Sequence, residues 1–305
     1  MVSKAFVPRV INELAPEITT LVDGLLDRIE KQGHFDAVSD LAYPLAVGVI
    51  CKLLGVPVED EPRFGRASAL LGQTVDPFLA AGADVPDGFD QRIEAGKWLR
   101  GYFRDIIERR RRAPSDDLIS ALIAVEETGD QLTEEEIIST CNLLLIAGHE
   151  STVSLIAHAV LAMLRNTGQW AALAAAPGRV SGVIEETLRY DAPAQLVGRI
   201  AADDMMVGET AVPRGDTMIL LLAAAHRDPA ATERPEVFDP ERKTFRHLAF
   251  GRGTHFCLGA PLVRLEASIV LSAVAARFPR ARLGGEPAYK PNVTLRGLAA
   301  LPVTV

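Results

Sequence analysis

The sequence contains little cysteine and no excess of positive charge. Its cysteines, Cys51, Cys141 and Cys257, are an odd number spread over 305 residues, which argues against a disulfide framework. The 32 Lys and Arg residues are outnumbered by 40 Asp and Glu, and the formal net charge is -8. Binding to phosphate backbones requires a basic surface, so this composition argues against a nucleic-acid partner.

Long uninterrupted hydrophobic runs are also scarce. The best candidate, LAYPLAVGVICKLLGVPV (residues 41–58), is interrupted by Pro44, Lys52 and Gly55, so we expect no membrane span. The first ten residues, MVSKAFVPRV, lack the apolar core of a signal peptide. These two absences predict a cytoplasmic protein.

What the chain does have is enough apolar sequence for one large core, since 48% of its residues are hydrophobic. We predict a single domain over residues 1–305, mostly α with minor β (α+β). A helical part covers about 1–190, and about 191–305 holds short strands, a proline-rich irregular segment, a cysteine-containing loop and a final helix. The predicted helices, apart from the longest, cover residues 14–33, 36–55, 59–73, 89–112 and 258–277; the β-like runs cover 195–202, 205–212, 217–224 and 295–305.

The longest predicted helix covers about residues 133–165. Thr133 followed by Glu136 forms a capping-box pattern, and no proline interrupts the sequence as far as Arg165. The length corresponds to about 50 Å, enough to cross a domain. The middle of this helix is apolar nearly all round, which predicts that it is buried.

One thiol stands in unusual surroundings. In FGRGTHFCLG (residues 250–259), Cys257 directly precedes a predicted helix, whose amides and dipole favour a thiolate. Gly251 and Gly253 allow a tight turn and a close approach to a flat partner, and Gly259 leaves room beside the thiol. This pattern suits one axial bond to a heme iron.

Two other interpretations of this stretch are open from the residues alone. A single cysteine is most often a small buried hydrophobic residue. A zinc site formed by His247, His255 and Cys257 is a second option, although closed zinc sites use four ligands and this spacing matches no common finger.

A second chemical segment, AGHEST, lies midway along the longest predicted helix. Ala147 and Gly148 are small enough for a ligand to press against the helix. Glu150, followed by Ser151 and Thr152, supplies an acid and two alcohols that can relay protons inside an apolar pocket. The alternative interpretation is an interior kink with a solvated glutamate.

These segments together resemble the cytochrome P450 family, the heme-thiolate monooxygenases. FGRGTHFCLG is similar to the family's heme-binding loop, and AGHEST to its oxygen-activation segment. EETLR (residues 185–189), which alone would be an ordinary surface ion pair, resembles the family's Glu-x-x-Arg element. The resemblance implies the cytochrome P450 fold and heme b, with Cys257 as the iron ligand.

The resemblance also implies roles for particular residues. Catalytic roles fall on Glu150 with Ser151 or Thr152; the family usually has threonine directly after the acid, where this chain has Ser151. Glu186 and Arg189 are implied to pair with Arg242 and to fix the cysteine loop. The residues implied to bind the cofactor, two of them through its propionates, are Cys257, His255, Arg199, Phe250, Gly251, Gly253, Ala147 and Gly148.

The implied activity is insertion of one atom of dioxygen into a small hydrophobic organic substrate. Electrons would come from NAD(P)H through a reductase and a ferredoxin or flavodoxin-type carrier. The segments that match the family's substrate pocket cover residues 70–82, the residues before Gly148, 193–198 and 294–298. The basic residues expected at the carrier's docking surface are Lys243, Arg246, Arg252 and Arg264.

Family members usually carry roughly another quarter of their length ahead of the segment SKAF, so we expect a cytochrome P450 fold without its N-terminal quarter. Two alternatives to the monooxygenase remain. One is a non-catalytic family member with impaired heme binding. The other is a peroxide-using peroxygenase, against which the acid and hydroxyls of AGHEST argue.

Overall fold

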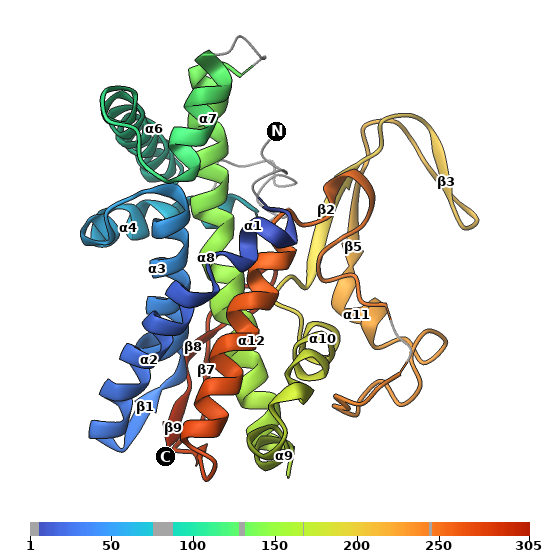
Figure 1. Ribbon diagram of the computed structural model, residues 1–305. Coiled ribbons are helices and arrows are strands. Elements are labelled where there is room, and N and C mark those ends of the chain that lie inside the picture. Colours follow the sequence, from blue (N-terminus) through green and yellow to red (C-terminus); the bar gives the residue numbers. More distant parts are fainter. Residues whose placement is uncertain (1–5, 76–87, 128–131, 167, 244–245) are drawn as a thin grey trace.

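The computed structural model of the protein describes residues 6–75, 88–127, 132–166, 168–243 and 246–305. Most of the described residues are helical, and small antiparallel β-sheets lie beside the helices (Figure 1). The helices are α1 (Pro8–Asn12), α2 (Ala15–Gln32), α3 (Tyr43–Leu54), α4 (Glu61–Gly72), α6 (Phe89–Arg112), α7 (Leu118–Glu127), α8 (Glu134–Arg165), α9 (Gln169–Ala175), α10 (Val180–Tyr190), α11 (Leu222–His226) and α12 (Ala260–Arg277). The strands are β1 (His34–Asp36), β2 (Leu196–Ile200), β3 (Met205–Val207), β4 (Thr210–Val212), β5 (Thr217–Leu221), β6 (Arg282–Leu283), β7 (Ala288–Tyr289), β8 (Leu298–Ala300) and β9 (Pro302–Thr304). The predicted mostly-α fold with minor β is confirmed.

Helix α8 forms the centre of the molecule, and its prediction from sequence is confirmed. The Thr133 side chain accepts a hydrogen bond from the backbone N–H of Glu136 (3.3 Å), and the Glu136 carboxylate accepts one from the N–H of Thr133 (2.7 Å). Every residue from Thr152 to Met163 is buried, because α3, α10 and α12 pack around this stretch (Figure 1). The buried half of α8 therefore fixes the positions of the elements that carry the chemical segments.

The predicted helix at 36–55 is interrupted. A π-helical segment (Ala37–Ala42) comes first, and α3 follows it with Pro44 in its first turn. Proline has no N–H to donate and fits only at the start of a helix, which explains why a new helix begins there.

Strand β1 contradicts the expectation that the first 190 residues are purely helical. His34 to Asp36 pair antiparallel with β9, so that His34 lies opposite Thr304. Asp36 strengthens the junction, because its carboxylate accepts hydrogen bonds from the N–H groups of Val38 (2.8 Å) and Leu301 (2.9 Å). Three residues are too few to show a periodic pattern, and their partner comes from the far end of the sequence.

We expected no apolar stretch long enough to span a membrane, and this expectation is wrong when only length and composition are considered. Within the described ranges, Ala37–Leu54 and Glu134–Arg165 are both long and apolar enough. In each, 61% of the apolar window is buried inside the molecule, and core helices of soluble proteins pass the same test. Their packing in the core accounts for their composition.

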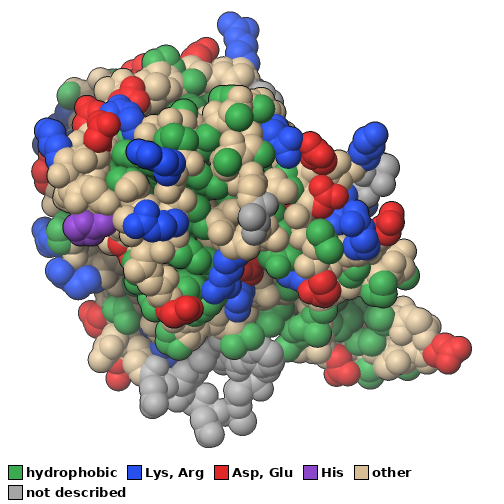
Figure 2. Space-filling model, turned by 90° about the horizontal axis from the view of Figure 1, so that it is seen from below, with side chains coloured by type: hydrophobic (Ala, Val, Ile, Leu, Met, Phe, Trp, Pro, Cys, Tyr) green, Lys and Arg blue, Asp and Glu red, His purple; other side chains and the backbone are tan. Residues whose placement is uncertain are grey.

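Charges of both signs are mixed on the surface drawn in Figure 2. On that face, Lys and Arg side chains stand singly or in small groups among Asp, Glu and hydrophobic side chains. This pattern differs from the continuous basic surface that a phosphate backbone requires.

Helix α12 carries one carboxyl group into the core. Glu266 is 1% exposed, and its Oε2 has no hydrogen-bond partner among the described residues. Burial raises the pKa of this carboxyl well above its usual range. Burial therefore favours the neutral form of this carboxyl in the native protein.

Replacing Glu266 by Gln should increase the free energy of unfolding at pH 8 by about 1–2 kcal/mol. The unfolded protein ionises this carboxyl once the pH exceeds about 4.3, whereas the native protein must keep it protonated. The native carboxyl therefore loses its stabilising contribution as the pH rises, and the gain from Glu266→Gln should shrink toward pH 4. Urea unfolding at both pH values checks this, with the exposed Glu13→Gln as control; an equal gain at both pH values would contradict it.

Candidate functional site

A cavity of about 270 Å³ separates α8 from the cysteine loop, which we define as residues 248–259. Most of its lining side chains are apolar, and they come from five separate parts of the chain. The lining residues are Gly72, Leu143, Ile146, Ala147, Glu150, Ser151, Leu155, Leu188, Pro193, Ala194, Ala249, Phe250, Cys257, Val263 and Leu295. The cavity thus brings together Cys257 and the acid of AGHEST, which are about a hundred residues apart in the sequence. Of the expected pocket segment 70–82, residues 76–82 lie outside the described residues.

The cysteine loop turns back on itself before α12 begins. The N–H of Gly251 donates to the Leu248 carbonyl (2.8 Å), and the N–H of Cys257 donates to the Phe250 carbonyl (2.8 Å). Gly251 and Gly253 both have positive φ, +68° and +67°, a conformation that glycine adopts without strain. The loop therefore needs glycine at these two positions for its own path.

Two opposing influences act on the pKa of the Cys257 thiol. Burial raises the pKa of the Cys257 thiol. Hydrogen bonds from the N–H groups of Gly259 and Ala260, and the nearby charge of Arg264, lower it but do not outweigh the burial. The start of α12 thus directs stabilising N–H groups at the sulfur, as predicted, but the effect of desolvation on the pKa is larger than theirs.

The AGHEST segment presents two of its polar groups to the cavity. Glu150 and Ser151 line it, together with Ala147. Thr152 is wholly buried on another side of α8, and its hydroxyl donates to the Gly148 carbonyl (3.3 Å). A Cβ on Gly148 would lie 2.8 Å from Ile50 of α3, so this glycine serves helix packing.

The residues around the cavity fit a heme with one thiolate ligand. Apolar side chains dominate the walls, and the side chain of Ala147 on α8 is small, which leaves space in the cavity that Cys257 also lines. The Cys257 thiol is half-buried and accepts hydrogen bonds from the backbone N–H groups of Gly259 and Ala260, which favour a negative charge on the sulfur. Metal coordination would add a positive charge and deprotonate the thiol.

The proposed zinc alternative finds no support in this part of the chain. Across the described ranges, no three His, Cys, Asp or Glu side chains converge as a metal site would require. His247 lies instead 3.0 Å from the Glu185 carboxylate. Arg199 and His255 are exposed and do not line the cavity; Arg199 donates to the carbonyl of its neighbour Gly198.

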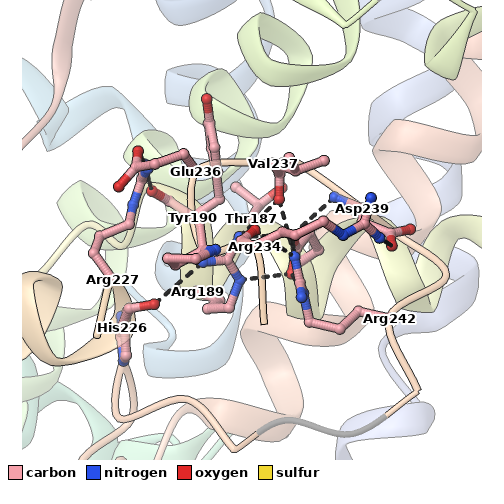
Figure 3. A network of polar contacts seen from close by, with 12 residues as sticks. Thr187, Arg189, Tyr190, His226, Arg227, Arg234, Glu236, Val237, Asp239 and Arg242 are labelled. Atoms are coloured by element: carbon pink, nitrogen blue, oxygen red, sulfur yellow. Dashed lines mark hydrogen bonds and ion pairs between the residues drawn. The ribbon is translucent and has the colours of Figure 1, made fainter. Parts of the chain in front are cut away.

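The predicted pairing of Glu186 with Arg189 and Arg242 is confirmed. The Glu186 carboxylate accepts two hydrogen bonds from Arg189 (2.9 and 2.7 Å), and Arg242 Nε lies 3.3 Å from it. Both arginines also donate to the Val237 carbonyl, at 3.1 and 3.0 Å. Figure 3 shows the guanidinium groups of Arg189 and Arg242 pointing toward one centre. This buried network anchors the irregular segment that we call the meander, residues 227–243.

His226 links the network to the cysteine loop. Its carbonyl accepts a hydrogen bond from Arg189 (3.2 Å), and its Nε2 accepts one from the N–H of Leu248 (2.7 Å). Burial, together with the charges of His247 and Arg189, lowers the pKa of His226 to about 4. The ring is therefore neutral at pH 7, as an acceptor nitrogen must be.

A second charge cluster beside the loop was not predicted from the sequence. The Glu185 carboxylate accepts two hydrogen bonds from Arg264 (2.6 and 3.0 Å), and His247 Nε2 lies within hydrogen-bond distance of it. Burial opposes its ionisation, but these partners prevail and lower the pKa of Glu185 to about 2. The Arg264 guanidinium also lies 4.5 Å from the ring centre of Phe250, which makes it a support of the loop. Glu185 and Glu186 are adjacent on one helix and must therefore face different sides. From the sequence, this alone indicates that Glu185 has partners other than those of Glu186.

A larger hollow of about 630 Å³ lies beside the cysteine loop. Three of the four basic residues expected near the loop, Arg246, Arg252 and Arg264, line it. Arg264 is paired with Glu185, and Phe256 is 54% exposed. The hollow thus combines cationic groups with one aromatic ring.

Comparison with known proteins gives the same picture for the whole chain. The cytochrome P450 family model matches residues 180–287. The biotin biosynthesis cytochrome P450 of Bacillus subtilis (strain 168) is 39% identical over 305 residues, which cover 100% of this chain and 76% of that protein. Ligand-free CYP164A2 of Mycobacterium smegmatis is 63% identical with a TM-score of 0.96, covering 100% of this chain and 78% of that one. P450BioI in complex with a hexadec-9Z-enoic acid ligated acyl carrier protein is 39% identical with a TM-score of 0.93, covering 99% and 77%.

Replacing Arg242 by Met should lower the free energy of unfolding by about 3 kcal/mol, because the buried Glu186 carboxylate loses one of its two cations. Urea unfolding measures the loss. Arg179→Met is the matched control, since Arg179 pairs with the exposed Glu241 of the meander and should cost less than about 1 kcal/mol. Equal losses in the two variants would show that the buried network has no special role.

Proposed function

The chain belongs to the cytochrome P450 family, and we propose that it inserts one atom of dioxygen into a small hydrophobic organic substrate. Family members bind heme b through a cysteine thiolate, and the heme supplies the oxygen activation. The observation that carries the proposal is an apolar cavity that has Cys257 on one wall and Glu150 and Ser151 on another.

The proposed heme contacts follow from these walls. Cys257 would ligate the heme iron, and Phe250, Gly251 and Gly253 would shape the loop that holds the cofactor. Ala147 leaves room for a ligand on the α8 side, and Gly148 allows α8 to pack closely against α3 at that point. Exposed Arg199 and His255 are the proposed partners of the propionates, because a guanidinium and an imidazole suit carboxylates.

Protons consumed in the reaction would reach the cavity through Glu150 and Ser151. Glu150 is 30% exposed and lines the cavity, so it can exchange protons with solvent and present them inside. The Ser151 hydroxyl now donates to the Ala147 carbonyl (3.2 Å) and can rotate toward the cavity. Thr152, being fully buried elsewhere, is the weaker candidate for this role.

The substrate is proposed to be small and hydrophobic, because most of the cavity walls are aliphatic or aromatic. The hollow beside the cysteine loop is the proposed docking surface for an acidic ferredoxin or flavodoxin-type carrier, fed by an NAD(P)H reductase. Arg246 and Arg252 supply positive charge there, and Phe256 supplies an exposed contact near Cys257. The likeness to bacterial relatives supports a cytoplasmic location.

The reduced protein with carbon monoxide should show the strongly red-shifted Soret band of thiolate-ligated heme. Cys257→Ala should abolish the band. Cys51→Ala should keep it, since Cys51 is buried within α3 and does not line the cavity. Absence of the band after heme reconstitution would favour a non-catalytic family member instead.

Ser151→Ala should lower the yield of oxidised product per NADPH by roughly tenfold, with hydrogen peroxide released in its place. An alkoxycoumarin dealkylation probe and a surrogate ferredoxin with its reductase measure both quantities. Thr152→Val should have a much smaller effect, because that side chain does not reach the cavity. A larger loss in Thr152→Val would assign the role to the threonine, and unchanged yields from peroxide alone in both variants would favour a peroxygenase.

A further inference from the structure

The acid of the AGHEST segment has a cationic partner from a distant part of the chain. Lys290 Nζ lies 3.3 Å from Glu150 Oε1, and it is the one basic side chain within ion-pair distance of that carboxylate among the described residues. The two side chains are 38% and 30% exposed, so the pair lies between the solvent and the cavity that Glu150 lines.

A hairpin formed by β7 and β8 brings Lys290 to α8. Lys290 directly follows β7, and its N–H donates to the Gly297 carbonyl (2.9 Å) just before β8. A Cβ on Gly297 would lie 2.6 Å from the Ser154 hydroxyl of α8, so a larger residue here would force that hydroxyl to move. Ser154 in turn donates to the Glu150 carbonyl (3.0 Å), one helical turn earlier. The hairpin is thus packed against the part of α8 that carries the acid.

The connecting loop, residues 290–297, is held firmly. The Asn292 side chain accepts hydrogen bonds from the N–H groups of Thr294 (3.0 Å) and Leu295 (2.9 Å). Arg296 Nε donates to the Asp191 carboxylate (2.9 Å), and Leu295 forms a bridge with Ala194. A loop fixed at both ends limits the positions that the Lys290 ammonium can take.

Two titratable neighbours of Glu150, His149 and Tyr43, are neutral at pH 7. Burial lowers the pKa of His149, the adjacent residue on α8, despite the charge of Glu150. Burial and a hydrogen bond to Glu61 raise the pKa of Tyr43, whose ring lies edge-on to His149. Lys290 is therefore the cation that faces the Glu150 carboxylate.

We propose that Lys290 is a positioning residue for proton delivery: it holds the Glu150 carboxylate at the edge of the cavity and links it to solvent. The inference rests on the proposed function of Glu150. Each turnover consumes two protons from solvent, and Glu150 passes a proton inward and is reprotonated from the water around the Lys290 ammonium. Lys290 itself forms and breaks no covalent bond.

The test compares Lys290→Met, Lys290→Arg and Glu150→Gln with the wild type, using the alkoxycoumarin probe. Lys290→Met should lower product per NADPH by roughly threefold to tenfold and enlarge the solvent isotope effect, and Lys290→Arg should restore most of the yield. Lys290→Met should add little in the Glu150→Gln background, since both variants interrupt one route. The exposed Lys97→Met is the control and should change nothing.

A second measurement is independent of turnover. In urea unfolding of the protein without substrate, the losses caused by Lys290→Met and Glu150→Gln should not add, as expected for a contacting pair. Additive losses in stability, or an unchanged product yield in Lys290→Met, would overturn the inference. If the carbon monoxide band and the product yield are intact in that variant, only the role of Lys290 falls; if the wild type gives no band, the proposed function falls with it.

Discussion

The buried carboxylate of Glu186 is the charge on which the cysteine-bearing half of the molecule depends. Arg189 of α10 and Arg242 of the meander both pair with it. Their guanidinium groups also donate hydrogen bonds to backbone carbonyls of the meander. The meander has no strand to hold it, so these hydrogen bonds replace a sheet. The hydrogen bond from the Leu248 N–H to His226 then connects this network to the loop that carries Cys257. A buried ion pair of this kind is costly to form and costlier to break, which favours one arrangement of the loop.

The chemistry of the site is decided by which way neighbouring side chains face. On α8, Glu150 and Ser151 line the cavity while Gly148 and Thr152 face other helices. On α10, Glu186 joins the meander network while Glu185 turns to Arg264 and His247. Adjacent residues on a helix point about 100° apart, so a six-residue motif necessarily divides its members between catalysis and packing.

Features set by nearby residues could be predicted from the sequence, and those set by distant ones could not. The capping box of α8 and the glycine turn before Cys257 are local patterns, and both were found. Strand β1 was not predicted, because its partner is a strand from the far end of the sequence, and the burial that opposes a thiolate at Cys257 is likewise set by distant residues. The Lys290 partner of Glu150 had no local signal, since 140 residues separate the two.

The pairing of β1 with β9 has a consequence for the order of folding. Residues 34–36 obtain their hydrogen-bond partners from residues 302–304, which are synthesised after all the helices described here. Helices with local contacts can form while the chain is still being made, whereas this sheet must wait. The short segment between α2 and the π-helical turn therefore stays without these partners until residues 302–304 are synthesised, so this sheet forms late.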